Sequence, residues 1–278
     1  MRTPRKFGYI KDDPDTRDYI YTLNREFLAV LPPKASVQAL CPPVYDQGNL
    51  GSCVANAVAV LISFAHLDHN FPDPVPSRLF IYYNARVLEG DPQDDSGCQI
   101  RDAIKSTVKQ GVCPEKEWPY NITRFAVQPS DSCYADALAD QVVSYHSIPQ
   151  SLDLMKGCIA EGFPFSIGIQ VYDNFPMDIG INEIPMPAGQ VVGGHAIDIV
   201  GYSDTTRMFL MRNSWGSSWG DNGYASIPYD YLSDPNLAND LWTIRTTLDE
   251  QSPAPVPPTP APSDGCLAGL LKKLGLNL

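Results

Sequence analysis

The sequence predicts an α+β protein built from two lobes with a seam between them. Helical periodicity dominates the first half of the chain, and strand patterns dominate the second half after Phe163. One segment, residues 54–66, is apolar nearly all round and must therefore lie at the centre of the protein. Because clefts at such seams commonly hold ligands, we expect the functional site between the two lobes.

Residues 1–35 are predicted to form an N-terminal arm that depends on a larger body for its order. The segment is polar and rich in Asp, and residues 18–22 are expected to be a short extended piece. Leu31-Pro32-Pro33 closes the arm. Two placements are open: the arm could lie across the cleft and restrict access to it, or it could run along the back of the body.

Four helices are expected before the period changes. Ser52 is a reasonable N-cap for the apolar helix, which puts Cys53 at the helix start, and Ser77 caps a helix over residues 78–88. Two more helices are indicated by apolar stripes that end at Gly111 and Gly162. The stripe positions are Ile100, Ala103, Ile104, Thr107 and Val108 for the first, and Leu152, Met155 and Ile159 for the second.

The second half of the body, which we place at residues 36–248, is predicted to consist of strands. Strand patterns cover residues 165–169, 195–202, 208–212, 224–227 and 241–245. Beyond the body, residues 249–264 form a Pro-rich stretch that predicts an extended linker. Residues 265–278 are Leu-rich, and we interpret them either as a short amphipathic helix that binds an unknown partner or as a frayed tail.

Composition limits the classes of function. The chain has 278 residues, of which 44% are hydrophobic and 19% charged, so a globular protein is expected. The net charge of -12 argues against nucleic acid as a partner, because no basic stripe is available to meet phosphates. The sequence contains no apolar run of about 18 residues, so a membrane span is not expected. The basic start is followed by Lys11-Asp12-Asp13, so a cleavable leader is not supported, and we expect the cytoplasm by default with leaderless export left open.

The seven cysteines suit one working thiol plus six that are either free or paired. Sequence alone cannot choose among the pairings, and buried free thiols are an equally good interpretation. The chain lacks a Cys-x-x-Cys pair and its four histidines are scattered, so neither a zinc site nor any cofactor is implied.

Three separated fragments carry chemistry. They are Gln47-Gly48-Asn49-Leu50-Gly51-Ser52-Cys53, Gly193-Gly194-His195-Ala196 and Arg212-Asn213-Ser214-Trp215-Gly216. Together they supply a thiol, an imidazole, an amide that can orient the imidazole, and a second amide before the thiol. That set matches a cysteine nucleophile, its base, the group that orients the base and an oxyanion donor.

Each member of this set would be structural if it stood alone, since a buried thiol or a strand histidine is usually a packed core residue. In combination they have a chemical purpose. A helix start and a nearby imidazolium both lower the pKa of a thiol, which favours Cys53 as a nucleophile. An amide oxygen of Asn213 accepting from one nitrogen of His195 would turn the other nitrogen toward the thiol. Trp215 could cover that hydrogen bond, whereas His66, His69 and His146 are better interpreted as structural.

On these motifs the chain resembles the papain-type cysteine peptidases, in particular the compact bacterial members. The stretch Asn213-Ser214-Trp215-Gly216-Ser217-Ser218-Trp219-Gly220 is the most specific part of the likeness, which covers roughly residues 31–245. His195 follows Cys53 at the family's own spacing of roughly 130–150 residues, and Asn213 lies slightly farther on. The resemblance implies a papain-like fold, with Cys53 on a helical lobe and both His195 and Asn213 on a β-barrel-like lobe.

The resemblance also implies roles for individual residues. Cys53 would be the nucleophile, His195 the general base and acid, and Asn213 the residue that orients it, while Gln47 and the Cys53 backbone N–H would form the oxyanion hole. The residues expected to border the substrate are Ser96, Gly97, Gly194, Ala196 and Trp219, with Trp215 and Ser52 as supporting residues. The chain departs from the family at Leu50, where a cysteine is usual, and at Val54, where an aromatic residue is usual.

The expected activity is therefore hydrolysis of peptide bonds by an endopeptidase acting on peptide or protein substrates. Two alternatives stay open at this point. The first is an acyl transferase with another acceptor, such as a peptide ligase or a transglutaminase-like enzyme. The second is a non-catalytic peptide-binding module on the same scaffold.

Overall fold

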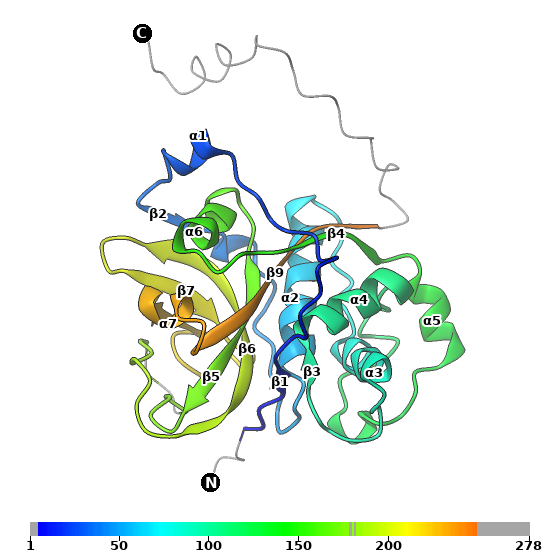
Figure 1. Ribbon diagram of the computed structural model, residues 1–278. Coiled ribbons are helices and arrows are strands. Elements are labelled where there is room, and N and C mark those ends of the chain that lie inside the picture. Colours follow the sequence, from blue (N-terminus) through cyan, green and yellow to red (C-terminus); the bar gives the residue numbers. More distant parts are fainter. Residues whose placement is uncertain (1–4, 178–179, 181, 249–278) are drawn as a thin grey trace, which may run out of the picture. The chain divides into compact units, whose positions relative to one another are not determined.

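A computed structural model describes residues 5–177, 180 and 182–248. The described chain has a helical half and a half built on a sheet, and one long helix, α2 (Cys53–Asp68), runs between them (Figure 1). The predicted linker and Leu-rich tail lie outside the described residues. Within the described ranges no helix is long and apolar enough to cross a membrane.

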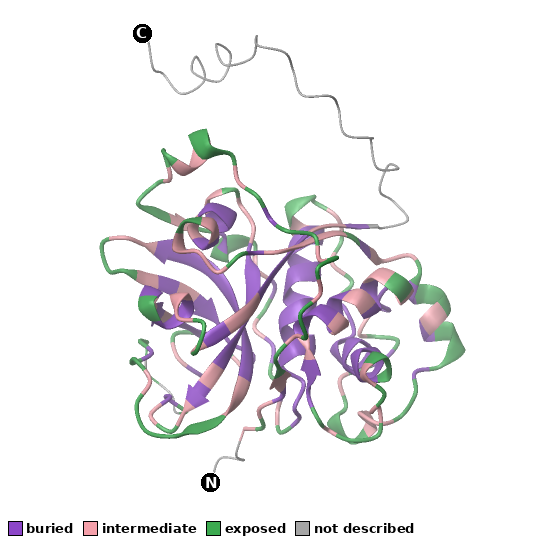
Figure 2. Cartoon of the chain, viewed as in Figure 1, coloured by how far each residue is buried: buried purple, intermediate pink, exposed green. Residues whose placement is uncertain are grey.

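The helical half packs around α2, as its apolar composition predicts. α3 (Arg78–Glu89) begins at Ser77, whose side chain accepts from the Phe80 backbone N–H, and it ends at Gly90 in the left-handed conformation. α4 (Ile100–Gln110) ends at Gly111, and the short α5 (Asp131–Ala137) completes this half. Every α2 side chain from Cys53 to His66 is buried, so burial on all sides stabilises this helix (Figure 2).

The other half is a seven-stranded sheet whose neighbouring strands all pair antiparallel. The strand order is β4-β9-β5-β6-β7-β8, and β2 pairs with β6. The strands are β2 (Lys34–Ser36), β4 (Gln141–Ser147), β5 (Phe165–Tyr172), β6 (Val191–Ser203), β7 (Met208–Arg212), β8 (Tyr224–Pro228) and β9 (Ala238–Leu248). α6 (Leu152–Ala160) and α7 (Tyr229–Ser233) pack on this sheet, and their side chains share one apolar core with it.

Each half has its own core, and the seam lies where α2 meets β6 and β9. Most apolar α2 side chains belong to a core that also includes Ala196 from β6 and Trp242 and Ile244 from β9. The alternate β6 residues Ile197 and Ile199 face the second core. Period-2 alternation along β6 therefore gives the strand one face for each core.

The four helices and five strands predicted within residues 54–245 are confirmed, and every strand except β7 is longer than expected. The predicted position of the N-cap at Ser52 is also confirmed. Ser52 occupies the N-cap position of α2 without a side-chain hydrogen bond to the helix. Its hydroxyl instead lies 2.5 Å from the Tyr120 hydroxyl. A side-chain partner in the packed protein has replaced the local cap.

The N-terminal segment is attached to the body at several places. The short α1 (Arg25–Leu28) lies on this segment, and β1 (Tyr9–Ile10) pairs parallel with β3 (Cys98–Gln99) in the helical half. The Tyr21 backbone N–H donates to the Ser147 carbonyl at 2.8 Å, and β2, which spans the predicted boundary at residue 35, joins the sheet. Figure 1 shows the segment running in front of α2, between the two halves.

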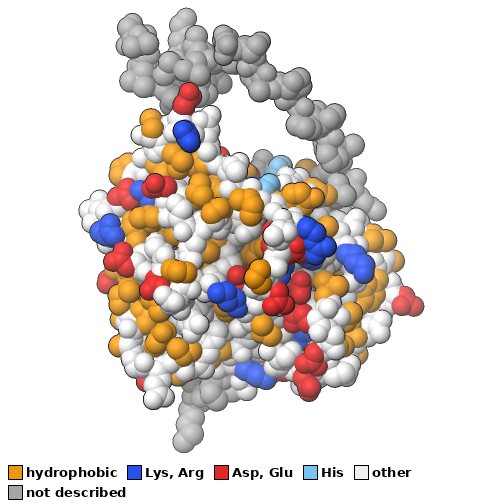
Figure 3. Space-filling model, in the orientation of Figure 1, with side chains coloured by type: hydrophobic (Ala, Val, Ile, Leu, Met, Phe, Trp, Pro, Cys, Tyr) orange, Lys and Arg blue, Asp and Glu red, His pale blue; other side chains and the backbone are white. Residues whose placement is uncertain are grey.

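Ion pairs fix the middle of this segment to α4. Arg101 pairs with Asp18 at 3.1 Å, and Lys105 pairs with Asp15 at 3.2 Å. Acidic and basic side chains lie close together on the face of the molecule shown in Figure 3. The six cysteines of the described part are all free thiols: Cys41, Cys53, Cys98, Cys113, Cys133 and Cys158.

Candidate active site

Cys53 is the first residue of α2 and is completely buried. The first N–H groups of a helix lack partners within the helix, so its start favours negative charge. The backbone N–H groups of Ala196 and Gly8 are close enough to the thiol to lower its pKa. The Cys53 sulfur is thus close to the backbone of Ala196, the residue that follows His195.

His195 lies in β6 with its ring held by two neighbours. Its Nε2 atom donates to Asn213 Oδ1 at 2.8 Å, and Asn213 directly follows β7. The Trp215 ring lies over the imidazole at a centroid distance of 4.9 Å and is itself buried, so it shields this hydrogen bond from water. With Nε2 engaged, Nδ1 is the free acceptor, and it has no hydrogen-bond partner among the described residues.

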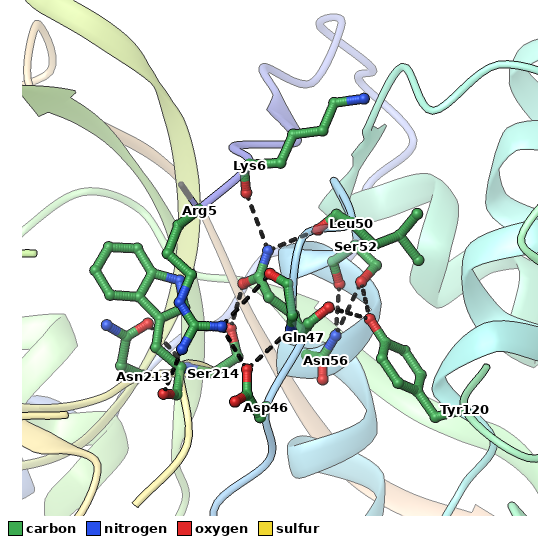
Figure 4. Close-up of polar contacts among 12 residues, drawn as sticks. Arg5, Lys6, Asp46, Gln47, Leu50, Ser52, Asn56, Tyr120, Asn213 and Ser214 are labelled. Carbon is green, nitrogen blue, oxygen red and sulfur yellow. Dashed lines mark hydrogen bonds and ion pairs between the residues drawn. The ribbon is translucent and has the colours of Figure 1, made fainter. Parts of the chain in front are cut away.

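The Gln47 side chain is held as firmly as the imidazole (Figure 4). Its Oε1 atom accepts from the Ser214 hydroxyl at 2.7 Å, and its Nε2 donates to the Leu50 carbonyl at 2.8 Å. The second Nε2 hydrogen is directed at the Lys6 carbonyl oxygen, 3.1 Å away. An amide donor fixed in this way is suited to stabilise an oxygen atom that gains negative charge.

The N-terminal segment itself lies on these residues (Figure 4). Arg5 pairs with Asp46 at 2.5 Å and donates to the Trp215 carbonyl at 2.9 Å. Lys6 pairs with Asp95 at 2.6 Å. The segment thereby contacts both halves of the protein within two consecutive residues.

Gly8 is the point of closest approach. A Cβ atom added at Gly8 would lie 1.8 Å from the Gly51 carbonyl oxygen, and one added at Gly97 would lie 2.2 Å from the Gly8 carbonyl oxygen. The Cys98 backbone N–H donates to that same Gly8 oxygen at 2.9 Å. Backbone is therefore packed on backbone, and only glycine permits it.

Comparison with known proteins agrees with this geometry. Residues 34–241, well over half of the chain, match the protein family described as "Papain family cysteine protease". The chain belongs to the papain family of cysteine proteases. The family assignment and the relatives described next give no support to the ligase or binding-module alternatives.

Two papain-family relatives cover most of the chain. Xylellain, a cysteine protease from Xylella fastidiosa, has a sequence 43% identical to this chain, and its crystal structure superposes with a TM-score of 0.83. The match covers 88% of this chain and 98% of the xylellain chain. A peptidase C1-like protein of Acanthamoeba polyphaga mimivirus is 38% identical over 276 residues, 88% of each chain. A cathepsin B-like protein of Giardia intestinalis is 28% identical over 200 residues, and the match spans 64% of its length. The protein is accordingly a cysteine endopeptidase that acts on peptides or proteins.

In this papain-family protein both titratable groups of the site are neutral near pH 7. Burial raises the pKa of the Cys53 thiol to about 11, against the opposing effect of the backbone hydrogen bonds. Burial also lowers the pKa of His195 to about 4, although the hydrogen bond to Asn213 opposes this. A thiolate facing an imidazolium is therefore disfavoured while the N-terminal segment covers the site.

The structure places the residues predicted to border the substrate in different surroundings. Gly97 and Gly194 lie against the N-terminal segment, since a Cβ atom at Gly194 would be 2.5 Å from the Tyr9 carbonyl oxygen. Ala196 lies at the thiol, whereas the Ser96 hydroxyl donates to the carbonyl of its neighbour Gly97. Trp219 is buried, packs against Trp215 at 5.6 Å and donates to the Pro176 carbonyl, so its contacts support Trp215.

The sequence reasoning missed the place of Tyr9 and its acidic partner. The Tyr9 ring lies on Gly168, where a Cβ atom would be 2.0 Å from the ring, and its hydroxyl donates to Asp240 at 2.5 Å. The signal for Gly168 was a glycine inside a strand, which often marks a close approach. Asp240 gave no such signal.

Asp240 also takes part in a pair of carboxyl groups that joins the arm to β9. It accepts from the Asp12 backbone N–H at 2.6 Å, while the Asp12 carboxylate accepts from Trp242 Nε1 at 2.8 Å. Burial, reinforced by the negative charge of Asp240, raises the pKa of Asp12 to about 7. Ionisation of both carboxyl groups would place two negative charges together at the point where the arm is attached.

Proposed function

We propose that Cys53, His195, Asn213 and Gln47 carry out the peptide hydrolysis. The observation on which this rests is the orientation of the imidazole: Nε2 donates to Asn213, which leaves Nδ1 free to exchange a proton with the thiol. The thiol at the start of α2 lies against the backbone of the residue next to that imidazole. A nucleophile, a base and an orienting amide are thus present in the order that the chemistry requires.

In the proposed reaction, His195 takes the Cys53 proton and the sulfur attacks the peptide carbonyl carbon. The carbonyl oxygen gains negative charge, which Gln47 Nε2 and the Cys53 backbone N–H stabilise. The C–N bond then breaks as the imidazolium gives its proton to the leaving amine, and a thioester remains. Water, deprotonated by His195, attacks the thioester and releases the acid and the thiol.

We further propose that residues 5–12 keep the enzyme closed. The Lys6 carbonyl accepts the same Gln47 hydrogen that an oxyanion would need, and the Phe7 ring lies against both His195 and Trp215, with centroid distances of 6.0 Å and 6.3 Å. The segment also excludes water, which holds both active groups neutral. The closed form would therefore lack both an accessible site and a reactive thiolate.

Peptide-library cleavage by the wild type and by Cys53→Ala tests the first proposal. The wild type should release fragments, and Cys53→Ala should release none. Cleavage by Cys53→Ala at the wild-type rate would rule out the assigned nucleophile.

Removal of part of the arm tests the second proposal. Deletion of residues 1–12 should raise activity, because the segment that crosses the site is lost while the attachments at residues 18–36 remain. Deletion of residues 1–35 is a poorer test, since it also removes Tyr21, which is buried in the core of the sheet. An unchanged rate after removal of residues 1–12 would show that the arm does not limit access.

A further inference from the structure

Tyr120 lies beneath the loop that connects the two oxyanion donors, Gln47 and the Cys53 backbone N–H (Figure 4). Its hydroxyl donates to the Gln47 carbonyl at 2.9 Å and lies 2.5 Å from the Ser52 hydroxyl. Gln47 and Ser52 are the two ends of this loop. One phenol therefore connects the residue that carries the first donor to the residue that precedes the second.

The hydrogen bonds around this phenol have a defined direction. The single Tyr120 hydrogen is used on the Gln47 carbonyl, so the Ser52 hydroxyl must donate to Tyr120. Asn56 Nδ2 donates in turn to the Ser52 hydroxyl at 3.2 Å and to the Ser52 carbonyl at 2.9 Å. The chain of donors runs from Asn56 through Ser52 and Tyr120 to Gln47, and each bond polarises the next.

Arg78 fixes the far end of this chain. Its guanidinium group lies 4.1 Å from the centre of the Tyr120 ring, donates to Asn56 Oδ1 at 3.3 Å and forms a short ion pair with Glu115. The ring is thus held by a cation on its face and by hydrogen bonds at its hydroxyl. Burial raises the pKa of Tyr120, so the phenol stays protonated and remains a donor.

We propose that Tyr120 is a positioning residue that sets the separation of Gln47 Nε2 from the Cys53 backbone N–H. The proposal rests on the function proposed above for these two donors. The loop between them contains Gly48, with φ +62°, and Gly51, and because glycine can adopt more backbone conformations than other residues, side chains outside the loop are needed to define its shape. Without the phenol hydroxyl, the Gln47 carbonyl and the Ser52 hydroxyl would lose their shared partner, and the donors would no longer match the transition state.

The test compares two reactions of the full chain. Hydrolysis of a peptide amide needs the oxyanion donors, whereas alkylation of Cys53 by iodoacetamide needs only an accessible thiolate. Both reactions require the arm to be displaced, so the ratio of kcat/KM to the alkylation rate does not depend on how often the arm opens. We expect Tyr120→Phe to lower this ratio about 10-fold, less than the roughly 10²–10³ expected for loss of a whole donor.

A peptide aldehyde provides the second measurement. The Cys53 sulfur bonds to the aldehyde carbon and the thiol proton ends on the aldehyde oxygen, which then occupies the oxyanion site. In Tyr120→Phe, the ratio of aldehyde affinity to the Cys53 alkylation rate should fall by the same factor as the ratio of kcat/KM to that rate. In a Gln47→Ala background the Tyr120→Phe effect should shrink to less than about 3-fold, because the donor that Tyr120 positions is already gone.

Tyr134→Phe is the matched control, because the Tyr134 hydroxyl donates to Asn84 at 2.9 Å in the same half of the protein. It should leave both ratios unchanged. If Tyr120→Phe does not fold, Ser52→Ala replaces it, and a ratio several-fold lower is again expected. Ratios within about twofold of the wild type would overturn the proposal. Absence of any peptide cleavage both by the wild type and by the variant that lacks residues 1–12 would instead contradict the proposed protease site itself.

Discussion

The proposal that the arm closes the site can be tested by replacing Gly8 with a residue that has a branched side chain. Gly8→Val would place a Cβ atom 1.8 Å from the Gly51 oxygen, 2.4 Å from its carbonyl carbon and 2.7 Å from its Cα. All three atoms belong to backbone, so no side chain can turn away to make room. The segment around residue 8 must leave its position, and activity should rise.

The size of the effect follows from the interactions that hold residues 7–9 on the body. The hydrogen bond between Cys98 N–H and the Gly8 oxygen contributes about 1 kcal/mol. The neighbouring Phe7 and Tyr9 rings each contribute about 1.5–3 kcal/mol when fully buried, and they are only partly buried here. Weakening the attachment by about 3 kcal/mol would raise the open fraction about 100-fold. The rise in activity is capped by the activity of the fully open enzyme.

The assay measures peptide-amide hydrolysis and the rate of Cys53 alkylation in parallel, with the thermal melting temperature as the test of folding. Ile10→Ala is the matched control, because the Ile10 side chain is 38% exposed and the substitution keeps the backbone pairing of β1 with β3. We expect both rates to rise together in Gly8→Val and neither to change in the control. Wild-type rates in a folded Gly8→Val protein would refute the reasoning.

Three further predictions concern the donors and the buried titratable groups. Gln47→Ala should lower kcat/KM, relative to the Cys53 alkylation rate, by about 10²–10³, and an unchanged ratio would remove Gln47 from the oxyanion site. Because the pKa of Asp12 is raised to about 7, docking of the arm is stabilised below the ordinary carboxyl pKa and loses this contribution as the pH rises through about 7. Hydrogen-exchange protection of the arm, corrected for intrinsic rates, should therefore fall between pH 5 and pH 8, and Asp12→Asn should flatten that profile. The pKa of His66 is raised to about 9 by its ion pairs, although burial opposes this, so its contribution to stability is complete below about pH 6.5 and is lost as the pH rises through about 9. Urea unfolding should show up to about 3 kcal/mol less stability from this group at high pH, and His66→Gln should lack that component.

The helices and strands were predictable because their signals are local. The apolar run of α2 and the stop at Gly111 depend on residues a few positions apart, and both are confirmed. β4 was missed because its burial alternates only weakly, with Val142 as its single fully buried residue. The two-residue strands β1 and β3 form through backbone contacts, which leave almost no side-chain pattern.

The catalytic residues of the candidate site were predictable from the sequence, but the closed arrangement with the arm lying across the site was not. Cys53, His195 and Asn213 stand in motifs, so their residue types alone indicated the chemistry. The placement of the arm depends on the close packing of Gly8 against the Gly51 backbone. Neither glycine stands in a sequence pattern that would predict this contact. The phenol of Tyr120 was likewise invisible, because its two partners belong to a loop more than 60 residues earlier in the chain.

The attachment of the arm to the body beyond residue 12 makes the crossing segment, residues 5–12, a tethered ligand. Tyr21 is fixed to Ser147, and β2 is fixed to β6, so residues 5–12 are presented to their own site at an effective concentration of the order of millimolar. Dilution of the protein cannot lower that concentration. A single cut between residue 12 and Tyr21 would turn the same segment into a free peptide at the bulk protein concentration. Weak contacts that suffice while the tether is intact would then no longer hold it, and opening by such a nick would be permanent.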